Sequence, residues 1–182
     1  MESSANLERW YALRVRSRHE KSVAAQLECK QYDVFLPLYK ARRKWVDRWK
    51  ALSLPLFPGY VFCRFNPGYR SGVLATGGVI GVVRVGSELA PLESSEIDAI
   101  RRVASSPLTV EPYPSLVRGQ RVTVMAGPLK GVTGTLLEIR KSVRLVISVE
   151  LLCRSVLVEI ERDWALPCET TQFARVSVYS TT

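Results

Sequence analysis

The segment 105–117, SSPLTVEPYPSLV, constrains the fold most because it separates two kinds of sequence pattern. It carries three prolines and no helical period, which is typical of a linker. Before it, apolar residues recur at helix and strand spacings, whereas after it they follow strand spacing alone. The sequence therefore predicts an α+β sandwich followed by a small all-β unit. The predicted divisions are a tail at 1–8, a first unit at 9–104, the linker at 105–117, a second unit at 118–168 and a tail at 169–182.

The first unit is predicted to run strand, helix, two strands, helix, strand and helix. Trp10–Arg16 alternates as a strand, and Ser17 and Glu20 form the S-x-x-E pattern of a capped helix start. A Pro58-Gly59 turn precedes a strand at Tyr60–Phe65. The other expected elements are helices at 18–30, at 67–76 and after a Ser95-x-x-Asp98 cap, and strands at 32–39 and 79–85. This order predicts an antiparallel sheet with helices packed on it.

The second unit is predicted to be a small SH3-like β-barrel. Its expected strands lie at 121–125, 132–139, 143–149 and 155–160, and the last two alternate regularly between apolar and polar residues. Gly127-Pro128, Gly131 and Gly134 follow the first of them. Glycines at such positions indicate positive φ or a close approach of the backbone, so the chain is expected to turn tightly here.

Positive charge is concentrated near the N-terminus. The chain has 26 Lys and Arg against 17 Asp and Glu, a net charge of +9, and 12 − 6 = +6 of it lies in the first 50 residues. Residues 40–50, KARRKWVDRWK, hold six basic residues, one acid and two tryptophans. Cations and flat rings suit a nucleic-acid surface, but the same run is equally compatible with a solvated hairpin.

The sequence contains no recognisable catalytic or metal site. Its four cysteines lie far apart and it has a single histidine, His19, so neither a zinc site nor a disulfide framework is predicted. No glycine-rich phosphate loop or paired nucleophile and base is present, so we expect no cofactor and no enzyme activity. No apolar run approaches about 18 residues, and MESSANLERW lacks a signal-peptide pattern. A cytoplasmic monomer without a membrane partner is therefore expected.

Two motifs carry a resemblance to a known family. Gly119–Thr135, GQRVTVMAGPLKGVTGT, resembles the KOW motif, which also occurs in ribosomal proteins. The N-terminal (NGN) domain of NusG-family transcription elongation factors is resembled by Trp10-Tyr11, the Glu20-bearing helix, Pro37 and the run Pro55–Phe62, PLFPGYVF. The basic arm and the LFPGYVF run are more similar to specialised paralogues of the RfaH and UpxY kind, which act at particular operons.

The resemblance implies where partners bind. Family members dock on the clamp helices of RNA polymerase through the positions Phe57, Pro58, Tyr60 and Phe62, and specialised relatives contact the non-template DNA strand through the positions Arg14, Arg16, Arg18 and His19. Strand alternation places Tyr60 and Phe62 on one face, which serves either that interface or the core. A small-subunit ribosomal protein or Rho remains open as a further partner of the KOW domain.

The expected function is therefore elongation and antitermination of transcription. A factor of this kind binds RNA polymerase and upstream non-template DNA, suppresses pausing and termination, and needs no catalytic residue. The alternative is a ribosome-associated RNA-binding KOW protein. It accounts for the positive charge, but it leaves the LFPGYVF run unexplained.

Overall fold

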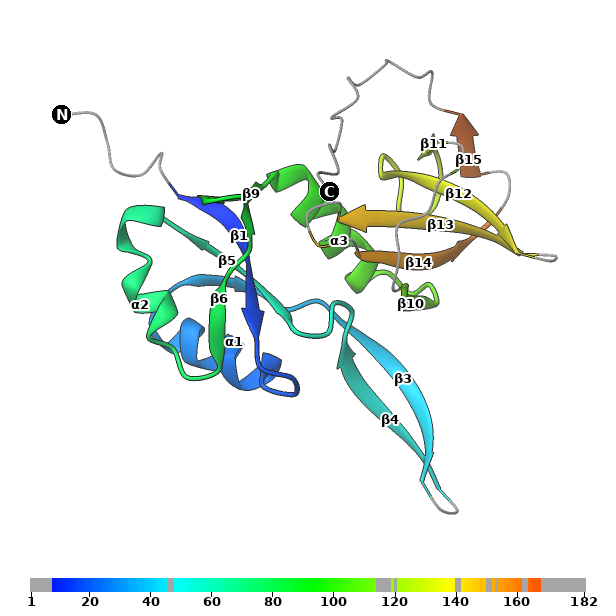
Figure 1. Cartoon of the computed structure of the whole chain (residues 1–182). Helices are drawn as coiled ribbons and strands as arrows, with labels where there is room; N and C mark the ends of the chain where they lie inside the picture. The colour runs from blue at the N-terminus through cyan, green and yellow to red at the C-terminus, as the bar shows by residue number, and fades with distance from the viewer. Residues whose placement is uncertain are drawn as a thin grey trace, which may run out of the picture.

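The computed structural model describes residues 8–45, 48–113, 119, 121–139, 142–149, 152, 154–161 and 164–167. The two predicted tails lie almost entirely outside these residues, as do Cys153 and Cys168. The described chain forms a mixed α/β N-terminal unit and a C-terminal unit made of strands (Figure 1). The predicted α+β class with antiparallel sheets is confirmed.

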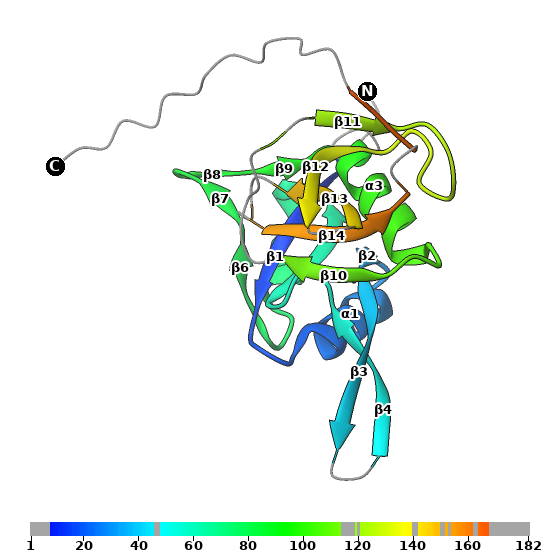
Figure 2. The ribbon, with the colours of Figure 1, turned by 90° about the vertical axis from the view of Figure 1, so that its right-hand side faces the viewer.

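The N-terminal unit is built on an antiparallel sheet in the order β2-β5-β1-β6, with β9 also beside β1. Its strands are β1 (Arg9–Val15), β2 (Asp33–Phe35), β5 (Tyr60–Phe65), β6 (Val79–Val82) and β9 (Pro91–Leu92). Helix α1 (Glu20–Cys29) covers one face of the sheet, and α3 (Ser94–Ser105) lies between the sheet and the C-terminal unit (Figure 1). Figure 2, seen from the side of the C-terminal unit, shows its strands in front of the first sheet. The helical turns η2 (Pro67–Tyr69) and α2 (Ser71–Leu74) lie between β5 and β6, and β7 (Arg84–Val85) pairs with β8 (Glu88–Leu89).

Alternation along β1 supplies side chains to two hydrophobic clusters. Tyr11, Leu13 and Val15 pack with Val23 and Leu27 of α1. Trp10 and Ala12 point to the opposite face, where they join a cluster that contains Ile97, Ile100 and Val103 of α3. Because both faces are covered, most of this strand is buried, and only Arg9 and Arg14 are exposed.

The basic segment 40–50 falls in a long hairpin that projects from the N-terminal unit (Figure 1). It consists of β3 (Leu38–Trp45) and β4 (Arg48–Pro55), which pair only with each other among the described strands. Their register runs from Leu38 opposite Pro55 to Trp45 opposite Arg48. The predicted strand 32–39 is therefore two strands, divided at Leu36-Pro37.

The C-terminal unit is a six-stranded antiparallel sheet in the order β10-β14-β13-β12-β11-β15. Its strands are β10 (Val110–Tyr113), β11 (Arg121–Val124), β12 (Thr133–Ile139), β13 (Ser142–Val149), β14 (Arg154–Ile160) and β15 (Ala165–Pro167). The four central strands match the predicted ones to within one residue at each end. The sequence pattern does not predict β10 or β15.

The predicted linker over 105–117 includes a strand at residues 110–113. These residues form β10, whose Pro112 stands opposite Val156 of β14. A proline is tolerated there because β10 is an edge strand. On the open side of an edge strand there is no neighbouring strand to bond, so a residue without an N–H costs no hydrogen bond of the sheet there. Residues 114–118 lie outside the described part of the chain.

Both predicted helix caps are wrong. The N-cap of α1 is His19, which makes no side-chain cap bond, and the Glu20 carboxylate bonds a distant turn instead of the start of its own helix. In α3 the capping box joins Glu93 and Glu96, and the Glu96 carboxylate accepts the Glu93 N–H at 3.1 Å. Helix α3 therefore begins at Ser94, ahead of the predicted Ser95 cap.

Helix α3 joins the two units. Its Ile100 and Val103 belong to the same hydrophobic cluster as Leu145 and Val158 of the C-terminal sheet. Its Arg102 donates a hydrogen bond from Nη1 to the Lys130 carbonyl at 3.0 Å. The two units are therefore in direct contact in this structure.

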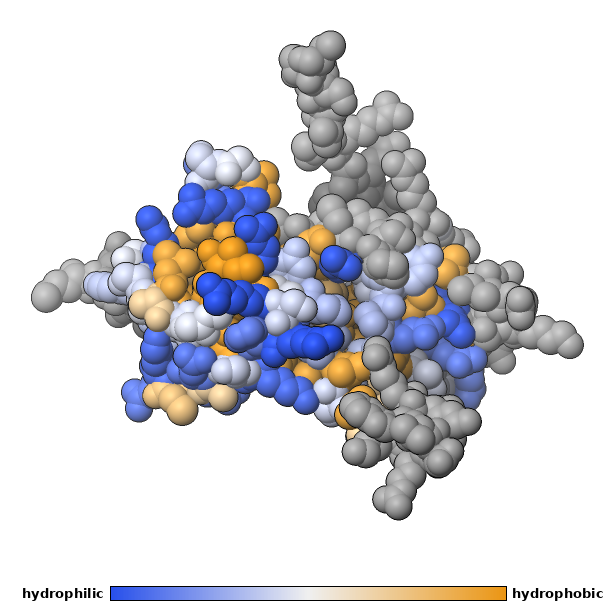
Figure 3. Space-filling model, turned by 60° about the horizontal axis from the view of Figure 1, so that its bottom comes forward, coloured by the Kyte–Doolittle hydropathy of each residue, from blue (hydrophilic) through white to orange (hydrophobic). Residues whose placement is uncertain are grey.

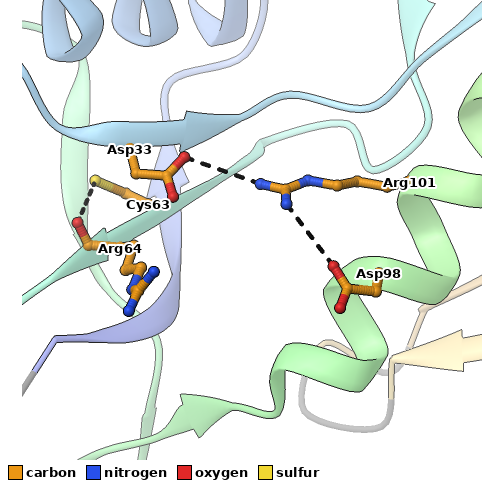
Figure 4. A network of polar contacts seen from close by, with 5 residues as sticks. All are labelled: Asp33, Cys63, Arg64, Asp98 and Arg101. Carbon is orange, nitrogen blue, oxygen red and sulfur yellow. Dashed lines mark hydrogen bonds and ion pairs between the residues drawn. The ribbon is translucent and has the colours of Figure 1, made fainter. Parts of the chain in front are cut away.

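Arg101 attaches α3 to the first sheet. Its guanidinium lies 5.1 Å from the centre of the Trp10 ring and 5.2 Å from that of Phe35. The same group forms ion pairs with Asp33 of β2 at 3.9 Å and with Asp98 of α3 at 3.7 Å (Figure 4). Because the charged side chains are about half-exposed, each ion pair contributes about 0–1 kcal/mol, and each ring contact contributes about 0.5–1 kcal/mol.

Candidate protein and nucleic-acid interface

The Phe57–Tyr60 segment forms a four-residue turn that leads into β5. The Tyr60 N–H donates to the Phe57 carbonyl at 3.1 Å, and Gly59 has φ +85°. Proline in the second position and a glycine with positive φ in the third are the requirements of a type II turn. The Pro-Gly pair therefore sets the path of the chain where β5 begins.

A second turn, Arg16–His19, joins β1 to α1. The His19 N–H donates to the Arg16 carbonyl at 3.0 Å, and Arg18 has φ +64°. The left-handed region costs a residue with a side chain about 1–2 kcal/mol. Arg18 adopts this conformation at that local cost, as Gln31 does after α1.

Three hydrogen bonds tie these turns to the sheet and to each other. The Val15 N–H at the end of β1 donates to the Gly59 carbonyl at 2.9 Å. The Gly59 N–H donates to Oε1 of Glu20, the first residue of α1, at 2.8 Å. The Arg16 N–H donates to the Gly78 carbonyl at 2.9 Å. Gly59 is therefore bonded on both sides to residues that flank the Arg16–His19 turn.

The structure brings the predicted DNA-binding residues together at one end of the sheet. Arg14, Arg16, Arg18 and His19 are all exposed. His19 Nδ1 also lies 3.1 Å from the Ser17 carbonyl. Figure 3 shows the molecule with the lower side of Figure 1 turned toward the viewer. On this face the N-terminal unit has a small apolar area surrounded by hydrophilic residues.

The predicted polymerase-binding residues are divided between the surface and the core. Pro58 is exposed and Tyr60 is half-buried, whereas Phe57 and Phe62 are 1% and 0% exposed. The two phenylalanine rings meet edge to face, 5.6 Å between centres. They belong to the cluster that contains side chains of α3 and of the C-terminal sheet. In this arrangement Phe62 is a core residue.

The β1–β5 register connects the two predicted surfaces. Arg14 stands directly opposite Tyr60, and directly opposite residues of an antiparallel pair project from the same face. An exposed cation and a half-buried tyrosine are therefore neighbours at the end of the sheet. The polymerase-binding and DNA-binding surfaces predicted from the sequence lie side by side.

The described residues contain neither a metal-binding cluster nor an activated Cys63 thiol. No cluster of three or more His, Cys, Asp or Glu that could hold a metal occurs among them. Cys63 is fully buried, and burial, followed by the charges of Asp33 and Glu8, raises the pKa of its thiol to about 12. The thiol therefore stays protonated at neutral pH and is a poor nucleophile. Within the described part of the chain, no helix has the length and apolarity needed to cross a membrane.

The glycines of the KOW-like segment occupy the predicted kinds of position. Gly127 and Gly131 have φ of +72° and +83°. A Cβ added to Gly134 would lie 2.7 Å from the Val146 carbonyl oxygen, so a side chain is excluded there by close approach of the backbone. Pro128 follows Gly127 and is exposed.

We expect alanine at Gly127 to cost more stability than alanine at Gly59. Both glycines have positive φ, which costs alanine about 1–2 kcal/mol. At Gly59 no atom lies within 4 Å of the added Cβ, whereas at Gly127 the Trp164 ring would lie 2.5 Å away. Overpacking of this kind adds about 1–3 kcal/mol. Urea unfolding of the two variants measures the difference, and equal losses would show that the Trp164 contact is unimportant.

Glu20 and Gly59 are the residues whose roles sequence reasoning missed. The S-x-x-E spacing assigned Glu20 to a local cap, because that pattern needs no knowledge of tertiary contacts. Only the fold shows that the Gly59 N–H lies within reach of the carboxylate.

Comparison with known proteins identifies the family. The fold is that of a two-unit α+β protein with a basic, exposed turn beside a tyrosine-bearing strand. Residues 8–101, more than half of the 182-residue chain, match the family NusG, described as "Transcription termination factor nusG". The chain belongs to the NusG family, and this membership implies a role in transcription elongation.

One solved structure shows the same fold. A structure described as "Domain interaction in Thermotoga maritima NusG" has 21% identity and a TM-score of 0.57, covering 89% of this chain and 98% of that one. Conformation B of the MjSpt4:Spt5 complex has 16% identity and a TM-score of 0.30, covering 90% of this chain and 99% of that one. No curated protein sequence is significantly similar to the chain.

Proposed function

We propose that the protein is a non-enzymatic transcription elongation and antitermination factor. It binds the clamp helices of RNA polymerase through the surface of Pro58 and Tyr60 and the non-template DNA strand through Arg14, Arg16, Arg18 and His19. The observation that carries this proposal is the β1–β5 register, which sets Arg14 opposite Tyr60. A single face can then contact protein and DNA together and favour one state of the elongation complex.

Phe57 and Phe62 take part only in a second arrangement of the protein. Both belong to the cluster shared with α3 and the C-terminal sheet, so they reach a partner only after the two units separate. In the arrangement described here, Tyr60 packs against the edge of the same cluster but is half-buried, so part of its side chain is accessible.

We assign the C-terminal sheet to a KOW domain. Support comes from Gly127, Gly131 and Gly134, whose backbone conformations and close contacts agree with the glycine pattern of that motif, and from the exposed Pro128 that follows Gly127. Binding of a small-subunit ribosomal protein or Rho through this domain remains a further possibility of the proposal. The basic β3–β4 hairpin favours a specialised, operon-directed paralogue of the RfaH and UpxY kind, acting in the cytoplasm.

The alternative, a ribosome-associated RNA binder, receives less support. The family match covers residues 8–101, which form the N-terminal unit, and not the KOW-like segment on which the alternative rests. Binding of the full chain to RNA polymerase and to ribosomal subunits separates the two functions. Retention by ribosomal subunits alone would favour the alternative.

Tyr60→Ala is expected to weaken binding to RNA polymerase about thirtyfold. Truncation of an interface aromatic commonly costs about 2 kcal/mol or more. Titration of fluorescently labelled full-length protein with core RNA polymerase measures the affinity. Tyr69→Ala is the matched control, because Tyr69 is the same residue type, 74% exposed, in η2. If both variants stay folded and bind like the parent, Tyr60 is outside the interface.

A further inference from the structure

Glu20 is a carboxylate that the helix cap does not explain. It is only 6% exposed although it is the first residue of α1, a position where an exposed acid would already interact well with the helix dipole. Burial of a charged group is costly unless hydrogen bonds replace its water. The Gly59 N–H supplies such a bond at 2.8 Å.

The partner of Glu20 belongs to the turn that presents Pro58 and Tyr60. In the Phe57–Tyr60 turn the N–H of the third residue is not used by the turn itself, whose closing bond runs from Tyr60 N to Phe57 O. Glu20 takes up this free N–H. Since the Gly59 carbonyl accepts from Val15, the central residue of the turn is held between β1 and α1.

Strand β1 and helix α1 also flank the Arg16–His19 turn. Val15 immediately precedes Arg16, and Glu20 immediately follows His19. A displacement of Gly59 therefore loosens contacts on both sides of the Arg16–His19 turn. No other carboxylate among the hydrogen bonds of the described residues joins α1 to the Phe57–Tyr60 turn.

We propose that Glu20 is a positioning residue that locks the Phe57–Tyr60 turn to the Arg16–His19 turn, so that the polymerase-contacting and DNA-contacting surfaces are held in one fixed relation. The proposal rests on the proposed function for the identity of the two partners. It assigns to Glu20 no contact with either of them. Without the bond, the turn populates other conformations, and the apparent affinity falls with the fraction that remains competent.

Three variants of the full chain test this role. Glu20→Ala removes the acceptor, Glu20→Gln keeps an acceptor oxygen but loses the charge, and Glu28→Ala is the control on the exposed side of the same helix. The first readout is the Gly59 amide in ¹H–¹⁵N NMR spectra, by chemical shift and by hydrogen exchange. In Glu20→Ala we expect the Gly59 amide signal to shift and its proton to exchange faster. Both changes should be smaller in Glu20→Gln and absent in Glu28→Ala.

The second readout is affinity, measured separately for RNA polymerase and for single-stranded DNA. We expect Glu20→Ala to weaken both by about tenfold, a change of about 1.4 kcal/mol, and Glu20→Gln to restore most of the loss. A protein weakened only in global stability would still bind at full strength below its unfolding temperature. Parental affinities in a folded Glu20→Ala variant whose Gly59 amide has changed would overturn the proposal.

Different experimental results would contradict the proposed function and the proposed role of Glu20. If the parent chain binds neither RNA polymerase nor DNA, the proposed function fails, and the Gly59 amide alone decides the structural claim. Faster exchange of Gly59 in Glu20→Ala then supports the lock between the turns. Unchanged exchange overturns it, whatever the parent binds.

Discussion

Phe62→Ala is expected to lower the free energy of unfolding by about 3–5 kcal/mol, the usual cost of truncating a buried phenylalanine. The side chain is fully buried and packs against Phe57 and Phe35, with ring centres 5.6 Å and 6.0 Å away. The cavity left behind would border the cluster that joins both units. Urea unfolding followed by tryptophan fluorescence measures the loss.

Tyr69→Ala is the control for this measurement. Its side chain is largely exposed, so the change should stay within about 0.5 kcal/mol. If Phe62→Ala also changes the free energy of unfolding by no more than about 0.5 kcal/mol, Phe62 is not a core residue, and its assignment to an interface is supported. If the expected loss is found, weaker polymerase binding by Phe62→Ala reports stability as well as contact, and Tyr60 becomes the cleaner probe.

Features set by local pattern could be predicted from the sequence. Strand β5 follows a Pro-Gly turn that dictates its start, and the alternation of β13 and β14 needs only period-two spacing of apolar residues. The turn at Pro58-Gly59, and positive φ or close backbone approach at Gly127 and Gly131, follow from residue type and turn position. None of these predictions requires knowledge of which segments meet in space.

Features set by distant contacts could not be predicted. The three prolines argued against a strand at residues 110–113, because only the position of β10 at the edge of the sheet makes Pro112 acceptable. Alternation put Phe62 on the face away from Val61 and Cys63, but whether that face meets solvent depends on α3 and the C-terminal unit. Glu20 was assigned to a cap because its partner Gly59 lies 39 residues away.

Replacement of Arg14, Arg16 and Arg18 by alanine is expected to remove most of the salt dependence of single-stranded DNA binding. All three side chains are exposed at the end of β1 and in the turn that follows. Three phosphate contacts on a single strand give a slope of log K against log salt of about −2, from about −0.7 per contact. Fluorescence anisotropy with an oligonucleotide at several salt concentrations measures the slope.

The triple variant should keep the fold and the affinity for the isolated clamp helices. Alanine at position 18 carries the same left-handed strain as the arginine it replaces, so that change alone should alter stability little. If one of the three arginines reads a base, its single replacement should relax sequence preference by about 1–3 kcal/mol, whereas loss of a phosphate contact should weaken all sequences alike.

The matched control replaces Arg42, Arg43 and Lys44, three basic residues of β3, and removes the same amount of charge. If net charge alone attracted DNA, both triple variants would flatten the slope equally. If the projecting hairpin binds the strand, only the β3 variant would flatten it, and the DNA site would move to residues 40–50. The expected result is loss of the slope in the Arg14, Arg16 and Arg18 variant alone, because the proposed function assigns DNA to these exposed cations, of which Arg14 stands opposite Tyr60.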